Sequence, residues 1–156
     1  MRLSGLNCIV TGGSSGIGAA SVKRFVDEGA KVLIADIDID AANSFAKEMG
    51  SSVDAIKCDV RVESDVKSVS EHAYKIWDKV DVLVNNAGSE LNQTYDKTTL
   101  EEWDRVLDTD LKGPWLMCKH IVPGMVKAGS GSVINISSLN GLVGFPLSTA
   151  YGSAKG

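Results

Sequence analysis

The sequence predicts an α/β protein with a doubly wound parallel sheet, and three observations lead to that prediction. Short apolar runs rich in Val and Ile alternate with longer segments in which apolar residues recur at the spacing of an amphipathic helix. The apolar runs show little alternation with polar residues, as expected for strands that helices cover on both faces. Each run is followed by a helical segment, which is the order of consecutive strand–helix–strand units on a parallel sheet.

The expected elements alternate along the whole chain. We expect strands at residues 7–11, 31–35, 53–58, 80–84 and 132–136. We expect helices at residues 16–28, 40–49, 63–78 and 100–127. Gly29, Gly50 and Gly129 stand where helix C-terminal caps belong, and either Thr98 or Thr99 can cap the start of the last helix. No linker or long repeat interrupts this order, so we expect residues 1–156 to form a single domain.

Composition excludes several classes of protein. The net charge of −4 comes without a basic stripe, which argues against a nucleic-acid surface. No apolar run reaches the roughly 18–20 residues that cross a bilayer, and the first strand begins too early to leave room for a signal peptide. Cys8, Cys58 and Cys118 are widely spaced and odd in number, which favours buried thiols over disulfides or a zinc site. We therefore expect a cytoplasmic protein with no metal, no membrane partner and no nucleic-acid partner.

A glycine-rich loop joins the first strand to the first helix. Its sequence, residues 11–18, is Thr-Gly-Gly-Ser-Ser-Gly-Ile-Gly. Such a loop lets the backbone approach a pyrophosphate, which the unpaired N–H groups of the following helix can bind. No Lys-Ser/Thr pair follows the last glycine, so the loop is not a Walker A motif, and a tight connection without a ligand is the alternative. A glycine loop at the first strand–helix junction of a doubly wound sheet is typical of a Rossmann fold. The predicted nucleotide contacts are Gly12, Ser14, Ser15, Gly16, Ile17 and Gly18.

Asp36 ends the second predicted strand, 18 residues past Gly18. An acid near this spacing accepts hydrogen bonds from the adenosine ribose hydroxyls and repels a 2′-phosphate. Its neighbours in the expected site, Ser15 and Ile37, carry no positive charge that would bind such a phosphate. The sequence therefore predicts NAD in preference to NADP, and a solvated acid at a strand end is the alternative.

At this point the motifs resemble those of the classical short-chain dehydrogenases/reductases. The glycine loop is followed by Asn-Asn-Ala-Gly at residues 85–88, by Ser138 and by Tyr151-x-x-x-Lys155, in the order and spacing of that family. The resemblance implies that Asp59 and Val60 flank the adenine. It also implies a cofactor wall formed by three residues, Asn86, Ala87 and Gly88. Tyr151 would be the acid/base, Lys155 would hold the nicotinamide ribose, and Ser138 would polarise the substrate oxygen, with Ser137 as its competitor.

Simple chemistry supports these roles. Reduction of a carbonyl by hydride needs a proton donor, and the hydroxyl of a free tyrosine titrates near pH 10, above the working range. Lys155 lies four residues after Tyr151, on the same helix face, where its positive charge favours the phenolate. A serine hydroxyl can donate to the developing alkoxide oxygen. We therefore expect an NAD(P)-dependent oxidoreductase that interconverts a secondary alcohol and a ketone.

One site residue departs from the family. The family commonly has asparagine where this sequence has Asp110, in Thr-Asp-Leu-Lys-Gly at residues 109–113. The family residue works through its main-chain carbonyl, which an aspartate also has. The extra carboxylate would nevertheless partly neutralise the charge of Lys155. We expect activity to peak at higher pH than it would with asparagine at position 110.

Family members continue well past a Tyr-x-x-x-Lys motif, so we expect this chain to be truncated at its C-terminus. The sheet would then be incomplete beyond residues 132–136, and the isolated chain would have no turnover. The alternative function is an inactive nucleotide-binding or dimerisation module. The resemblance also implies a small alcohol or carbonyl substrate and a homo-oligomer, dimer or tetramer, in the full-length protein. Trp115 and Met117 on the last predicted helix are candidate subunit contacts.

Overall fold

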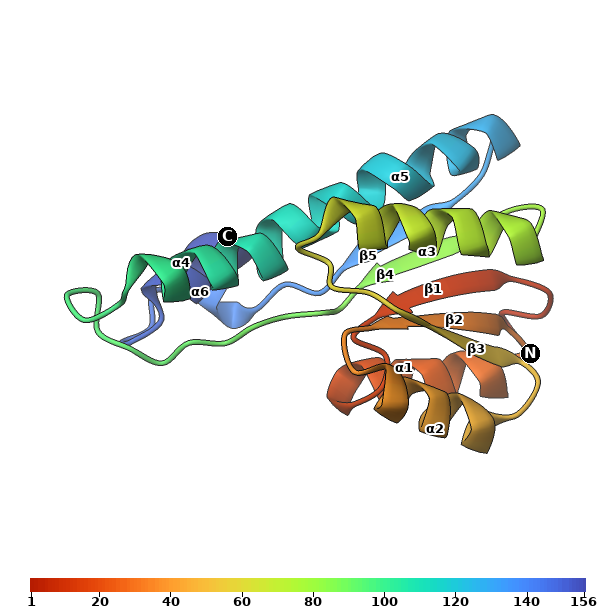
Figure 1. The fold of residues 1–156 in the computed structure, drawn as a ribbon, viewed down its shortest axis with the longest axis horizontal. Helices are drawn as coiled ribbons and strands as arrows, with labels where there is room; N and C mark the ends of the chain where they lie inside the picture. Colours follow the sequence, from red (N-terminus) through yellow and green to blue (C-terminus); the bar gives the residue numbers. More distant parts are fainter.

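One parallel sheet of five strands organises the computed structural model, which describes residues 1–156. The strand order is β3-β2-β1-β4-β5 (Figure 1). The strands are β1 (Asn7–Thr11), β2 (Lys31–Asp36), β3 (Val53–Lys57), β4 (Val82–Asn85) and β5 (Ser132–Asn135). From β1 the chain winds outward through β2 to β3, and then returns to β4 on the other side of β1. This reversal creates a crevice at the carboxyl ends of β1 and β4, where open α/β sheets bind their ligands.

Helices cover both faces of the sheet (Figure 1). One face carries α1 (Gly16–Asp27) and α2 (Ile39–Met49), and the opposite face carries α3 (Glu63–Ile76) and α5 (Gly113–Ala128). Alternate residues of β1 serve the two layers: Cys8 and Val10 pack toward the first pair of helices, whereas Ile9 packs toward the second. The predicted doubly wound fold is therefore confirmed, and its strands are apolar because both faces are buried.

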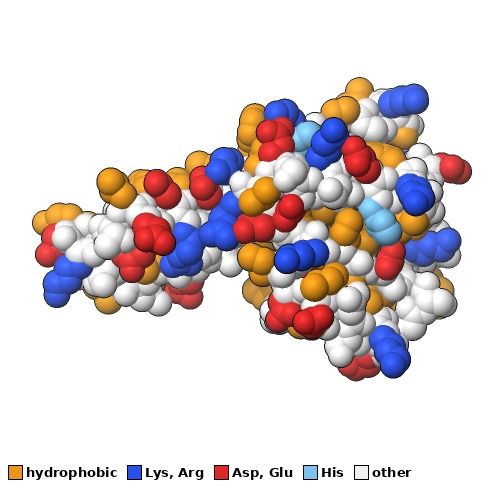
Figure 2. Space-filling view, in the orientation of Figure 1, with side chains coloured by type: hydrophobic (Ala, Val, Ile, Leu, Met, Phe, Trp, Pro, Cys, Tyr) orange, Lys and Arg blue, Asp and Glu red, His pale blue; other side chains and the backbone are white.

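A separate helical arm extends beyond the carboxyl edge of the sheet (Figures 1 and 2). It consists of α4 (Leu100–Leu107), the 3-10 turn η2 (Leu139–Gly141) and α6 (Thr149–Lys155). Its small core joins Val106 of α4 to Ala150 and Ala154 of α6. A capping box fixes the start of α4, because the Thr99 hydroxyl accepts the backbone N–H of Glu102 while the Glu102 carboxylate accepts that of Thr99. The arm holds the last residues of the chain beside the open crevice.

The single long helix expected at residues 100–127 is wrong. The structure divides it into α4 and α5, joined by a π-helical turn, η1 (Asp108–Lys112). Pro114 lies in the first turn of α5, where it cannot donate an N–H to the carbonyl of Asp110 four residues earlier. A wider turn accommodates that missing bond, and such π turns are frequent at functional sites. Pro123, by contrast, lies inside α5 without ending it.

The two residues expected as subunit contacts differ in their exposure. Trp115 is 58% exposed, whereas Met117 is fully buried against the sheet and belongs to the core. The prediction for Met117 is therefore wrong for this structure. β5 forms one edge of the sheet, and all four of its residues are exposed. No helix of this structure has the length and apolar character that a membrane span requires.

Two of the three cysteines are inaccessible. Cys8 and Cys58 are buried, and burial raises the pKa of each thiol to about 12. Because thiolates rather than thiols attack disulfide reagents, neither side chain should react at pH 8 in the folded protein. Cys118 is only half-buried. We expect a colorimetric disulfide reagent to titrate at most one thiol per native chain, and three after denaturation. Rapid reaction of two or more native thiols would contradict this prediction.

Candidate functional site

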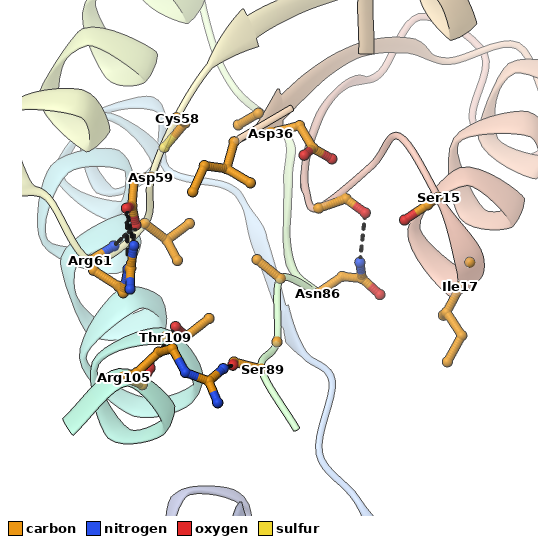
Figure 3. Close-up of a pocket in the computed structure, with 17 residues that line it drawn as sticks. Ser15, Ile17, Asp36, Cys58, Asp59, Arg61, Asn86, Ser89, Arg105 and Thr109 are labelled. Atoms are coloured by element: carbon orange, nitrogen blue, oxygen red, sulfur yellow. Dashed lines mark hydrogen bonds and ion pairs between the residues drawn. The ribbon is translucent and has the colours of Figure 1, made fainter. Parts of the chain in front are cut away.

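A cavity of about 560 Å³ opens at the carboxyl ends of β1 and β4 (Figure 3). Its walls come from the glycine loop, the ends of β2 and β3, the segment after β4, and the arm. Ten of the predicted nucleotide contacts line it: Gly12, Ser15, Gly16, Ile17, Asp36, Asp59, Val60, Asn86, Ala87 and Gly88. The two predicted loop contacts that do not line the cavity are Ser14 and Gly18, of which Gly18 lies in the first turn of α1. Residues far apart in the sequence thus meet at the crevice that the strand order creates.

Close packing fixes the shape of the glycine loop. Gly12 and Gly16 have φ angles of +62° and +52°, in the left-handed region that L side chains rarely adopt. At Gly18 a Cβ would overlap the carbonyl oxygen of Gly12 and would lie 2.6 Å from Nδ2 of Asn86. The last glycine of the motif therefore lets the first turn of α1 lie directly against the loop.

The segment after β4 is bonded to the same loop. Nδ2 of Asn86 donates to the carbonyl oxygen of Gly12 at 3.0 Å (Figure 3). It also donates to the carbonyl oxygen of Thr11 at 3.0 Å. The hydroxyl of Thr11 accepts the backbone N–H groups of Asn86 and Ala87, also at 3.0 Å. These bonds tie together the two strand ends that flank the crevice. The opening between them is consequently held by buried polar contacts rather than by flexible side chains.

Asp36 lies at the upper wall of the cavity and is almost fully buried. Its Oδ2 accepts the backbone N–H of Ser14 at 2.9 Å, and its Oδ1 accepts the backbone N–H of Asp38 at 3.0 Å. Each carboxylate oxygen has two acceptor positions, so one position on each oxygen remains for a ligand hydroxyl. The side chain thus supports the glycine loop and also offers acceptors to the cavity. The sequence did not indicate the first of these roles.

The opposite wall carries an ion pair that sequence reasoning missed. Nε of Arg61 donates to both carboxylate oxygens of Asp59, and its Nη2 lies 2.6 Å from Oδ2 (Figure 3). Hydrogen bonding to the Arg61 guanidinium lowers the pKa of the Asp59 carboxyl. This pairing partly neutralises the positive charge of Arg61 at the cavity wall. The sequence offered one indication of this ion pair, because Arg61 follows Asp59 by two residues.

The first turn of α1 differs from those of the helices around it. It contains no acidic residue, and the hydroxyl of its N-cap, Ser15, accepts no backbone N–H. By contrast, α2, α3 and α4 each carry acids in the first turn. The unpaired N–H groups at the start of α1 therefore face the cavity without a competing negative charge, an arrangement suited to an anion.

Lys155 and Tyr151 lie behind one end of the cavity, on α6. The Lys155 ammonium is 5.6 Å from the centre of the Tyr151 ring, and it donates to the carbonyl oxygen of Ile136 at 2.8 Å. A Cβ added to Gly88, which lines the cavity, would lie 3.8 Å from that ammonium nitrogen. Lys155 therefore adjoins the cavity through Gly88, and the Tyr151 ring lies beside Lys155, although neither side chain lines the cavity.

The two candidate serines differ in their hydrogen bonds. The hydroxyl of Ser137 donates to the carbonyl oxygen of Lys155 at 2.8 Å. The hydroxyl of Ser138 accepts the backbone N–H of Asn140 at 3.2 Å and begins η2. Ser137 has thus committed its only proton to α6, whereas the proton of Ser138 has no partner in the structure.

Asp110 meets Lys155 at the junction of η1 and α6. Its Oδ1 lies 3.0 Å from Nζ of Lys155, with the side chains 0% and 8% exposed. The ammonium is not directed along a hydrogen bond to that oxygen, which has no donor, so the contact is an ion pair. Its Oδ2 accepts the backbone N–H of Ser89 at 2.8 Å. The carboxylate expected near Lys155 is therefore in direct contact with it.

The arm also contributes two cavity residues that the sequence analysis did not select. Arg105 of α4 donates to the hydroxyl of Ser89, and Thr109 lies one turn further on (Figure 3). Their spacing of four residues places them on one helix face. That periodicity was visible in the sequence, but it did not reveal that the face would lean over the crevice.

Comparisons with known proteins agree with this geometry. A family model described as short chain dehydrogenase matches residues 7–156. The chain is 37% identical to the 3-oxoacyl-acyl-carrier-protein reductase FabG of Thermotoga maritima, covering 99% of this chain and 64% of that protein. It is 38% identical to momilactone A synthase of Oryza sativa subsp. japonica, covering 99% of this chain and 57% of that protein.

A solved structure is similar over nearly the whole chain. It is a metagenomic short-chain oxidoreductase in complex with NADP, which superimposes with a TM-score of 0.94 at 31% sequence identity. The match covers 99% of this chain and 72% of that one. The present chain therefore spans about three fifths of the curated relatives it matches.

Proposed function

Because this chain belongs to the short-chain dehydrogenase family, we propose that it is the dinucleotide-binding and catalytic part of an oxidoreductase. The proposed reaction interconverts a secondary alcohol and a ketone, with residues 1–156 acting as one NAD-binding domain. The observation that carries the proposal is that one cavity begins at the glycine loop and ends at Gly88, directly in front of Lys155. The proposed dinucleotide site thereby adjoins the amine of Lys155, which faces the ring of the candidate proton donor, Tyr151.

The residues present fit a dinucleotide. Its pyrophosphate would lie against the glycine loop and the uncapped N–H groups of α1, and its adenosine would extend between Asp36 and Val60. The nicotinamide ribose would then fall near Lys155. A test needs no turnover: titration of the purified chain with NADH, followed by energy transfer from tryptophan to the dihydronicotinamide, should saturate. Absence of saturable binding of both NADH and NADPH would refute the proposal.

We propose NAD as the preferred cofactor. The support is the Asp36 carboxylate, whose charge would repel a 2′-phosphate on a ribose bound to it. The contrary case rests on the related metagenomic oxidoreductase, which binds NADP. A 2′-phosphate would need a cation beside it. Arg61 lines the same cavity, but its guanidinium is paired with Asp59. A preference for NAD predicts tighter binding of NADH, and a preference for NADP predicts tighter binding of NADPH.

Replacing Asp36 with asparagine should reduce the difference in affinity between NADH and NADPH. The substitution keeps one acceptor oxygen for the loop while removing the charge and the second acceptor. We expect the Kd for NADH to rise by roughly ten- to a hundredfold and that for NADPH to fall, because hydrogen bonds to a charged group contribute about 1.5–3 kcal/mol. Asp40→Asn, which removes an exposed carboxylate from the first turn of α2, is the control. Equal effects on both cofactors would contradict the NAD preference.

The proposed chemistry divides among three side chains. When bound, the reduced dinucleotide supplies the hydride that adds to the carbonyl carbon. Tyr151 donates its phenolic proton to the carbonyl oxygen, so ketone, hydride and proton together give the alcohol. Lys155 favours the resulting phenolate through its charge. Ser138 donates its uncommitted proton to the same oxygen, which supports choosing it over Ser137.

A second candidate function is a dinucleotide-binding module without turnover. The observation in its favour is the Asp110–Lys155 ion pair, which engages the amine that the proposed chemistry needs. The two candidates differ in a direct assay: both predict saturable NADH binding, whereas only the enzyme oxidises NADH when ketones are supplied. We propose a homo-oligomer for the complete protein, with the exposed Trp115 as a contact.

A further inference from the structure

A buried acid stands behind the proposed proton donor. The carboxylate of Asp110 has no exposed surface, and Lys155 is the one cation in contact with it. Burying an unpaired carboxylate is very costly, so this charge persists only with compensation from its neighbours. The ion pair therefore links the two residues energetically, whether or not a cofactor is bound.

We propose that Asp110 is the counter-ion of Lys155, a positioning residue that holds the ammonium behind Gly88 and sets the pH at which Tyr151 gives up its proton. This inference rests on the proposed function for its chemical meaning. Its physical content, an electrostatic coupling between three side chains, can nevertheless be tested without any substrate or cofactor.

One hydrogen bond and two features of the backbone hold the carboxylate in this place. The backbone N–H of Ser89 donates to Oδ2, and the π turn η1 carries the residue toward α6. A Cβ at position 88 would lie 3.0 Å from Oδ1, so Gly88 leaves just the space that the acid needs. The carboxylate is thus anchored at one oxygen and presents the other to the ammonium.

The charges around Tyr151 come from three elements. Its own helix supplies Lys155, and η1 supplies Asp110, while Asp108 and Lys112 of η1 pair with each other on the exposed side. On α4, the guanidinium of Arg105 donates to Ser89, Glu102 is bonded to Thr99 in the capping box, and the two other acids of the helix are exposed. The turn η2 carries no charged residue, and Glu90 in the loop before α4 bonds to Asn92.

These positions give the sign of the coupling. The positive charge of Lys155 favours the ionised phenol, and the negative charge of Asp110 offsets part of that effect. Removing the carboxylate leaves Lys155 without its acidic partner, so its charge should favour the ionised phenol of Tyr151 more strongly. A residue that served only to fill space would leave this ionisation unchanged when replaced by an isosteric amide.

The test follows the ionisation of Tyr151 by NMR in the cofactor-free chain labelled with carbon-13 at tyrosine Cζ. The chain has three tyrosines, and the Tyr151→Phe variant identifies the signal of interest. In Asp110→Asn we expect that signal to titrate at lower pH than in the unaltered chain. Asp108→Asn, which removes an exposed acid of the same π turn, should leave it unchanged.

An unchanged or higher midpoint in folded Asp110→Asn would overturn the proposal. If that variant does not fold, the unaltered chain decides through nitrogen-15 spectra of its lysine ammonium groups. A Lys155 signal that persists near neutral pH, where exposed lysines exchange too fast to be seen, supports the held ion pair. Exchange of Lys155 as fast as that of the exposed lysines overturns it. Neither result depends on whether the protein is an oxidoreductase.

Discussion

Replacing Gly18 with alanine is expected to weaken dinucleotide binding and to destabilise the fold. The added Cβ would overlap the carbonyl oxygen of Gly12, and it would also press on the amide of Asn86, which is bonded to that carbonyl. Both obstacles are fixed by other contacts, so either α1 or the loop must move. Such overpacking costs about 2 kcal/mol. We expect NADH affinity to fall by at least about tenfold, since the amides that would hold the pyrophosphate move with the loop.

Gly144→Ala provides the matched control for this experiment. A Cβ at Gly144 has no atom within 4 Å, and its backbone is outside the left-handed region. Thermal unfolding and NADH titration should therefore match those of the unaltered chain. If Gly18→Ala behaves like Gly144→Ala in both measurements, the close packing of loop and helix does not create the nucleotide site.

Removing the hydroxyl of Tyr151 should nearly eliminate turnover while leaving cofactor binding intact. In Tyr151→Phe the ring that packs in the arm core remains, and only the proton that the reaction needs is lost. General acid catalysis contributes about 10²- to 10⁴-fold, so we expect kcat to fall within that range. The Kd for NADH should stay within about twofold, because the Tyr151 side chain does not line the cavity.

This measurement belongs in the longest natural form of the protein, with NADH oxidation followed in the presence of a panel of ketones. Tyr95→Phe is the control, because Tyr95 is 81% exposed in the loop before α4. It should retain full activity. Turnover by Tyr151→Phe at the level of the Tyr95→Phe control would remove Tyr151 from the mechanism and leave the dinucleotide-binding proposal standing.

Much of the fold could be predicted because it depends on local patterns. The strand at Asn7–Thr11 was predicted with its observed bounds, and the other strands differ by one or two residues at their ends. Buried parallel strands reveal themselves as apolar runs, and glycines reveal caps and turns. The prediction of a helix at residues 100–127 missed the division into α4 and α5 because it also relied on local patterns. Apolar periodicity continues across η1, and the local signals of an interruption were Pro114 and Pro123, of which only Pro114 stands at the observed break.

The candidate site divides along similar lines. Gly12, Gly16 and Asp36 were predictable because a phosphate loop and its acid lie at fixed distances along one strand–helix–strand unit. Arg61, Arg105 and Thr109 were not, because their place at the cavity depends on how β3 and the arm approach it. The second use of Asp36, supporting the loop through Ser14, likewise appears only in three dimensions.

The sequence alone determined the parallel sheet, the glycine loop at its first crossover, and the set of residues that could perform the chemistry. Tertiary structure decided which of these meet: it opened the cavity at the reversal of strand order, placed Tyr151 and Lys155 behind Gly88, and buried Asp110 against the ammonium. The physical reason is the range of the interactions. Helix period, strand alternation and turn geometry depend on neighbours within a few residues, whereas an ion pair between positions 110 and 155 exists only after the packing of η1 against α6 has removed both groups from water.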